Sequence, residues 1–185
     1  MKKCLLIIDM QYDFMEGGPL AVAGGLSLIP KIQKITTEYD IIFSTQDFHP
    51  KNHIGFASSH NMTPFTQKDG EMLWPDHCIE NTKGAQIVAE LDNCIPQKNK
   101  YLKGLYKTNG YSIGEHAEFM NMIKQFDQVD ICGVAFDYCV KSSAISIVKN
   151  VKHTRVLTKL CKSVNPQDDA KIHTELISAG VELID

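Results

Sequence analysis

The sequence has no long hydrophobic run, since no stretch approaches the roughly 20 apolar residues that a transmembrane helix needs. The apolar segment that starts at Cys4 is interrupted by Asp9, too early for a secretory signal peptide. A strong excess of one charge is also missing, because the formal net charge is −3 and the lysines are scattered. We therefore expect neither a membrane nor a nucleic acid as a partner.

Paired cysteine motifs are absent as well. None of the six cysteines forms a CxxC pair, and several lie in apolar strand-like segments. This pattern favours reduced thiols in a cytoplasmic enzyme. Apart from a long loop over residues 48–82, we find no linker, repeat or low-complexity stretch. With 185 residues and 43% hydrophobic content, the chain is predicted to form a single domain over residues 1–185.

Strand and helix patterns alternate along the chain. Strand-like runs lie near residues 4–9, 40–46, 99–103, 129–135, 154–158 and 181–184. Helical patterns lie near residues 26–38, 84–91, 114–126, 138–150 and 167–179. The alternation predicts an α/β fold: a doubly wound, mainly parallel sheet of about six strands with helices on both faces.

Cys139 is a candidate nucleophile. The apolar run VDICGVAF predicts a strand and CVKSSAISIVKN predicts a helix, so Cys139 falls at a strand-to-helix turn. Backbone N–H groups at a helix N-terminus stabilise negative charge, which favours a thiolate and offers donors to an oxyanion. The alternative is a buried cysteine that acts only as a small hydrophobic residue.

Asp9 and Lys103 are the groups that could activate such a thiol. Asp9 closes an apolar run typical of a parallel strand, and ligands bind beyond the carboxyl ends of such strands. It could be a general base, or it could cap the following loop. Lys103 ends the segment KNKYLK, and by itself it indicates a solvated surface charge unless a partner such as Asp9 draws it inside. We expect Asp13 to be structural.

A carboxylate and two imidazoles form a candidate metal site. Asp47 and His49 follow the strand-like segment DIIFST, and His77 lies in WPDHC. Three protein ligands leave positions open for water or substrate, as in catalytic metal centres. Without His77 nearby, Asp47 and His49 would be an ordinary polar loop. The remaining histidines comprise two further candidates, His53 and His60, and three expected surface residues, His116, His153 and His173.

These segments resemble the nicotinamidase (pyrazinamidase) branch of the isochorismatase-like cysteine hydrolase superfamily. The matching motifs are IIDMQYDF, TQDFHPKNHIGF, WPDHCIENTKGAQ, YLKG and GVAFDYCV. The resemblance implies a catalytic triad and a metal site. The triad is Asp9, Lys103 and Cys139, and the metal ligands are Asp47, His49 and His77. The implied cofactor is one divalent metal ion, with zinc favoured over iron or manganese.

The same resemblance implies a substrate and a mode of binding. Nicotinamide would be hydrolysed to nicotinate and ammonia through a thioester, as in NAD salvage, and pyrazinamide-like analogues would also react. A cis peptide between Val134 and Ala135 would direct the N–H groups of Ala135 and Cys139 to the oxyanion. Three aromatic residues would bind the pyridine ring: Phe14, Trp74 and Tyr111. A homo-oligomer is possible.

The sequence departs from the family pattern in two places. Gly55 stands where many relatives have serine, and the segment from Ala57 to Leu73 is long, so a fourth metal contact stays open. The spacing from Lys103 to Tyr111 is also one residue longer than in some relatives.

Other functions stay open. A related amidohydrolase acting on N-carbamoyl or ureido compounds would keep the triad but would not need the metal set. A non-catalytic binding protein, or one that uses Cys139 in redox sensing, is a further alternative. An isochorismate-cleaving enzyme fits least, because that branch does not use the cysteine.

Overall fold

A six-stranded parallel sheet forms the centre of the computed structural model, which describes residues 1–107 and 109–185. The strands lie in the order β5-β2-β1-β6-β7-β8, and every neighbouring pair is parallel. The bounds are β1 Lys3–Ile8, β2 Ile41–Asp47, β5 Lys100–Lys103, β6 Gln128–Val134, β7 His153–Lys162 and β8 Glu182–Ile184. The predicted α/β fold is confirmed.

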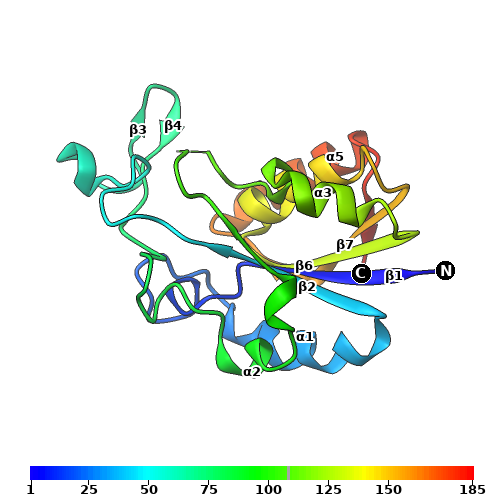
Figure 1. The fold of residues 1–185 in the computed structure, drawn as a ribbon. Coiled ribbons are helices and arrows are strands. Elements are labelled where there is room, and N and C mark those ends of the chain that lie inside the picture. The colour runs from blue at the N-terminus through cyan, green and yellow to red at the C-terminus, as the bar shows by residue number, and fades with distance from the viewer. Residues whose placement is uncertain (108) are drawn as a thin grey trace.

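Helices cover both faces of this sheet. Within the described residues the α-helices are α1 Ile29–Ile35, α2 Ala89–Asp92, α3 Ala117–Ile123, α4 Lys141–Ile147 and α5 Asp169–Ser178. With the sheet seen nearly edge-on, α1 and α2 lie on one face and α3 and α5 on the other (Figure 1). None of the helices in the described part is long and apolar enough to cross a membrane.

The central strands are apolar because both of their faces are covered. In β1, the residues from Cys4 to Ile8 have no exposed surface, and every residue of β6 is buried. A near-continuous hydrophobic run is the expected sequence of a parallel strand packed between two helical layers. In the register of the sheet, Leu6 lies opposite Phe43 of β2 and Ile131 of β6.

Three segments differ from their predicted structure. The helix predicted near 84–91 covers only Ala89–Asp92, because Gly84 and Gln86 instead accept backbone hydrogen bonds from the loop that follows β1. The helix predicted near 138–150 starts as a π-helical turn over Phe136–Val140, before α4. The loop 48–82 contains a short antiparallel hairpin, β3 (Gln67–Lys68) with β4 (Glu71–Met72), which projects away from the sheet (Figure 1).

All six cysteines are free thiols. Cys94 is half-buried and the other five are buried.

Candidate active site

The candidate site lies where four neighbouring strands end. Asp9 follows β1, Asp47 and Lys103 are the last residues of β2 and β5, and Cys139 lies in the π-helical turn after β6. The carboxyl ends of parallel strands meet at one edge of the sheet, which is where α/β proteins bind ligands. A cavity of about 520 Å³, including its part open to solvent, lies there.

Lys103 lies between two carboxylates and the thiol. Its Nζ atom is 2.7 Å from Asp9 Oδ2, 2.5 Å from Asp47 Oδ1 and 3.3 Å from Cys139 Sγ. The lysine is only 6% exposed and Asp9 is fully buried. Lys103 is therefore a buried, paired lysine and not a solvated surface charge. Its contact with Asp47 was not expected from the sequence.

Burial sets the protonation of this group. It raises the pKa of Asp9 to about 6 against the opposing effect of Lys103. Burial also raises the pKa of Cys139 well above its usual value, although Lys103 acts in the opposite direction. At neutral pH the resting cysteine is thus a thiol beside an ionised Asp9. Because the resting cysteine keeps its proton, a base must take that proton before the sulfur can attack.

The backbone and one hydroxyl hold Asp9 in place. Its φ of 46° lies in the left-handed region, which residues other than glycine rarely adopt. Thr45 donates its hydroxyl to Asp9 Oδ1 at 2.6 Å, and this bond lowers the pKa of the carboxyl group. Thr45 was not among the residues expected at the site. It lies on β2 directly beside Asp9, a proximity that only the strand pairing reveals.

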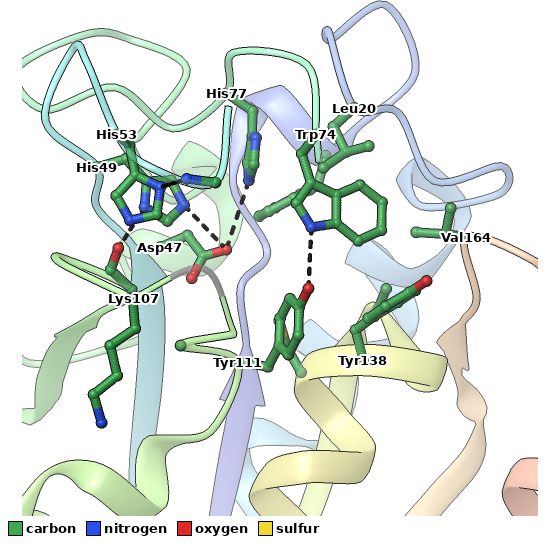
Figure 2. A pocket seen from close by; sticks show the side chains of 16 residues that line it. Leu20, Asp47, His49, His53, Trp74, His77, Lys107, Tyr111, Tyr138 and Val164 are labelled. Carbon is green, nitrogen blue, oxygen red and sulfur yellow. Dashed lines mark hydrogen bonds and ion pairs between the residues drawn. The ribbon is translucent and has the colours of Figure 1, made fainter. Parts of the chain in front are cut away.

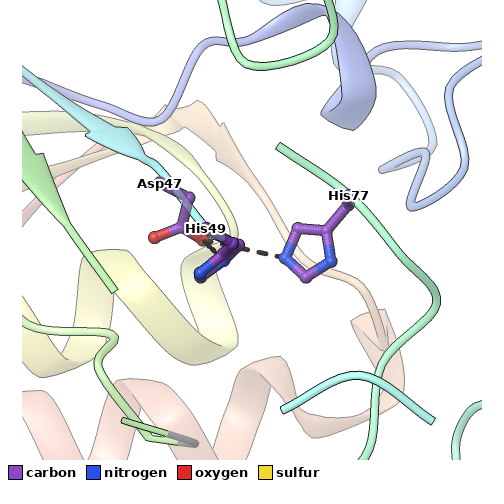
Figure 3. Close-up of side chains that lie close together, drawn as sticks. All are labelled: Asp47, His49 and His77. Carbon is purple, nitrogen blue, oxygen red and sulfur yellow. Dashed lines mark ion pairs between the residues drawn. The ribbon is translucent and has the colours of Figure 1, made fainter. Parts of the chain in front are cut away.

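The proposed metal ligands Asp47, His49 and His77 lie together. Their ligand atoms are within 4.8 Å of one another, and Asp47 Oδ2 is 3.7 Å from His49 Nε2 and 3.9 Å from His77 Nε2 (Figure 3). The other ring nitrogens face carbonyl oxygens: His49 Nδ1 is 2.6 Å from Gly104 O and His77 Nδ1 is 2.7 Å from Pro75 O. Because a carbonyl only accepts, each Nδ1 donates its proton to that carbonyl, and each Nε2 faces Asp47.

The charge of the cluster also fits a cation. Burial acts to raise the pKa of Asp47, but Lys103 and His49 outweigh it and hold that pKa well below its usual range. Burial lowers the pKa of His77 to about 4, so its imidazole is neutral at pH 7. Asp9 and Asp47 therefore both carry a negative charge beside the positive charge of Lys103. A divalent ion bound to neutral imidazoles and a carboxylate suits this donor set.

Aromatic side chains form the other half of the cavity. Phe14, Trp74 and Tyr111 all line it, and Trp74 Nε1 donates to the Tyr111 hydroxyl at 3.1 Å. Tyr138 packs edge-to-face against Trp74 with ring centroids 4.8 Å apart, a contact not expected from the sequence. In Figure 2 the Asp47 and histidine groups lie on one side and the aromatic groups on the other. The cavity thus offers a polar end and flat apolar walls.

The remaining histidines divide into one at the site and four outside it. His53 is buried, lines the cavity and stacks on His49 with ring centroids 4.3 Å apart. His60 instead directs Nε2 to the carbonyl of Ile54. The three histidines expected at the surface are half-buried and do not line the cavity: His116, His153 and His173.

The turn that carries the thiol begins at a cis peptide between Val134 and Ala135, as the resemblance implied. The Ala135 carbonyl accepts from the N–H groups of Tyr138 and Val140, which closes the turn. Ala135 and Cys139 both line the cavity. Their use as oxyanion donors stays a prediction.

Asp13 has a structural position. Its carboxylate accepts from the backbone N–H of Cys78 at 2.7 Å, next to His77. The bond ties the loop after β1 to the loop that carries this histidine.

An α/β fold with a buried aspartate, lysine and cysteine beside a candidate metal site characterises a class of hydrolases, and the chain is similar to known members of one family. Residues 3–185 match the isochorismatase domain, so the chain belongs to the isochorismatase family. The nicotinamidase/pyrazinamidase of Mycobacterium tuberculosis is 35% identical over 194 residues, covering 98% of each chain.

Two solved structures are also similar. Yeast nicotinamidase bound to the inhibitor nicotinaldehyde superimposes with a TM-score of 0.86 at 30% identity, covering 99% of each chain. The pyrazinamidase of Pyrococcus horikoshii in complex with zinc gives a TM-score of 0.79 at 29% identity, covering 100% of this chain and 99% of the other.

Proposed function

We propose that this hydrolase is a nicotinamidase that converts nicotinamide to nicotinate and ammonia and also accepts pyrazinamide-like amides. The observation that carries the proposal is the contact of Lys103 with Asp9, Asp47 and Cys139 beside a cavity with aromatic walls. The full-length relatives with this activity support it. The Asp47, His49 and His77 group favours this reaction over hydrolysis of ureido compounds, which needs no metal set.

The first half of the reaction uses the thiol of Cys139. Asp9 accepts the Sγ proton, and the sulfur attacks the carboxamide carbon of the substrate. Lys103 stays protonated, because its two carboxylate partners outweigh the effect of burial and raise its pKa well above the usual value. Its positive charge stabilises the developing thiolate. The N–H groups of Ala135 and Cys139 would bind the oxyanion.

The second half returns the enzyme to its resting state. Protonated Asp9 gives its proton to the leaving nitrogen, and ammonia departs from the thioester. Asp9 then deprotonates a water molecule that attacks the thioester. As the carbon–sulfur bond breaks, Asp9 returns this proton to Cys139 Sγ, which restores the thiol, and the product leaves as nicotinate after losing its proton to solvent. One carboxyl group thus acts twice as base and twice as acid, for which a pKa of about 6 is suited.

The cavity supplies binding and orientation. Phe14, Trp74 and Tyr111 would enclose the pyridine ring. Asp47, His49 and His77 would hold one divalent ion, zinc in first place, with iron or manganese as alternatives. When bound, this ion supplies a Lewis acid that can hold the pyridine nitrogen. We further propose that residues 1–185 act as one domain and that the free cysteines reflect a cytoplasmic location.

Ammonia release from nicotinamide by the purified, zinc-supplemented protein tests the proposal. Benzamide is the matched control substrate, because it keeps the carboxamide and the flat ring but lacks the ring nitrogen. We expect rapid release from nicotinamide and much slower release from benzamide. No release from nicotinamide, together with release from an N-carbamoyl amino acid, would contradict the assignment.

Removal of the metal is expected to abolish activity. Dialysis against a chelator should release about one zinc ion per chain, and addition of zinc should restore ammonia release. Metal content by atomic emission and the rate on nicotinamide are the two measurements. The His77→Ala variant should lose metal and activity together. Full activity in a sample shown to be free of metal would show that the reaction does not need the ion.

Activity is expected to fall in acid as Asp9 becomes protonated. Since the pKa of Asp9 is about 6, kcat/KM for nicotinamide should decrease as the pH drops through that value, by about tenfold for each further unit. The Thr45→Val variant loses the hydroxyl that lowers this pKa, so its acidic limb should move to higher pH. A profile that is flat between pH 5 and pH 7 would exclude Asp9 as the base.

A further inference from the structure

The side chain of Gln11 binds both backbone polar groups of Asp47. Gln11 Nε2 donates to Asp47 O at 2.7 Å, and Gln11 Oε1 accepts from Asp47 N at 2.8 Å. The same Nε2 donates to Ala85 O at 2.8 Å. Gln11 has no exposed surface, so these bonds form away from competing water.

This carboxamide takes the place of a missing strand residue. The pairing of β1 with β2 ends at Ile7 opposite Ser44, whereas β2 continues to Asp47. On its other side Asp47 lies opposite Lys103 of β5. Because a primary amide carries the same donor and acceptor as a peptide group, Gln11 can complete the ladder at Asp47.

The position of this backbone determines what the carboxylate of Asp47 can reach. Asp47 is a short residue with two side-chain torsions, and its Oδ1 contacts Lys103 while its Oδ2 faces His49 and His77. A small shift of its Cα atom would therefore move one oxygen away from the lysine or the other away from the imidazoles. Contacts that orient metal ligands are commonly worth 10-fold to 100-fold in metal affinity, as an order of magnitude.

We propose that Gln11 is a positioning residue that sets Asp47 for metal binding, without itself touching the ion or the substrate. This inference rests on the proposed metal site. The neighbouring Gln46 offers a natural comparison. Its Nε2 donates to the same Ala85 carbonyl at 2.9 Å, but the described hydrogen bonds include none from its side chain to the backbone of Asp47.

The test is the zinc affinity of Gln11→Met, measured by competition with a chromogenic chelator. Methionine keeps the length of the side chain and removes all three hydrogen bonds. We expect the zinc dissociation constant to rise about 10-fold to 100-fold relative to wild type. The matched control Gln46→Met should bind zinc as wild type does. Ammonia release by Gln11→Met should recover when zinc exceeds its weakened dissociation constant, which a merely structural defect would not allow.

A second variant distinguishes a positioning role of Gln11 from a role in folding. Gln11→Glu keeps the size and one acceptor for the Asp47 N–H group, but places an oxygen against the carbonyls of Asp47 and Ala85, so zinc binding should again weaken. If either variant folds and binds zinc with wild-type affinity, the role of Gln11 is overturned, whereas the proposed metal site stands. Unfolding of both variants would also overturn it, because it would assign Gln11 to general stability. Failure of the wild-type protein to bind zinc would overturn the metal site and the inference together.

Discussion

Replacement of Cys139 by alanine is expected to reduce ammonia release from nicotinamide by at least about 10³-fold, because no other group can form the thioester. The sulfur lines the cavity, and Lys103 Nζ lies 3.3 Å from it. The variant should keep its fold, since it loses a single sulfur atom from a side chain that already borders a cavity. Initial rates at saturating substrate and the thermal unfolding midpoint are the measurements.

The controls separate the nucleophile from general loss of thiols. Cys94→Ala removes a half-buried thiol at a distance from the cavity lining and should keep wild-type activity. Cys139→Ala should still bind zinc, because its side chain is not among the proposed ligands. Activity of Cys139→Ala above a tenth of the wild-type rate would show that another mechanism operates.

Replacement of Lys103 by methionine is expected to have the largest effect on stability. The lysine is 6% exposed and lies between Asp9 and Asp47, both of which are ionised at neutral pH. Removing the cation leaves two buried carboxyl groups without their counter-charge, for which a loss of roughly 3–5 kcal/mol in the free energy of unfolding is expected. Activity should be lost as well, because nothing then stabilises the developing thiolate. Urea unfolding of the metal-free protein measures the change in the free energy of unfolding.

Lys100→Met is the matched control on the same strand. Lys100 pairs with Asp92 at 2.6 Å, but Asp92 is 43% exposed in its side chain, so the loss should stay below about 1 kcal/mol. Adding Asp9→Asn to Lys103→Met should recover part of the stability, since it replaces a buried carboxyl group that has lost its cationic partner by a neutral amide. An unchanged free energy of unfolding in Lys103→Met would contradict the charge assignment of the whole cluster.

Local sequence patterns predicted most of the helices and strands. The apolar run that begins at Cys4 predicted β1, because a buried parallel strand must be hydrophobic on both faces. The pattern around Pro30 predicted residues 26–38, where short 3-10 turns flank α1. The prediction was wrong for residues 84–88, since their conformation depends on hydrogen bonds to the distant loop after β1. The β3–β4 hairpin has only two residues in each strand, too few for an alternating pattern.

The sequence by itself determined the fold class and which residue types stand at the ends of the strands. It also placed Asp9, Asp47 and Cys139 each at or just after the end of a strand-like run, and the family resemblance implied that Asp9 and Cys139 act together. Only the tertiary structure decided that Lys103 is buried, that Asp47 contacts both the lysine and the imidazoles, and that Gln11 and Thr45 hold the two aspartates. Those outcomes depend on the order and register of β5, β2 and β1, which join residues far apart in the chain. The protonation of the thiol followed in turn from the burial that this packing creates.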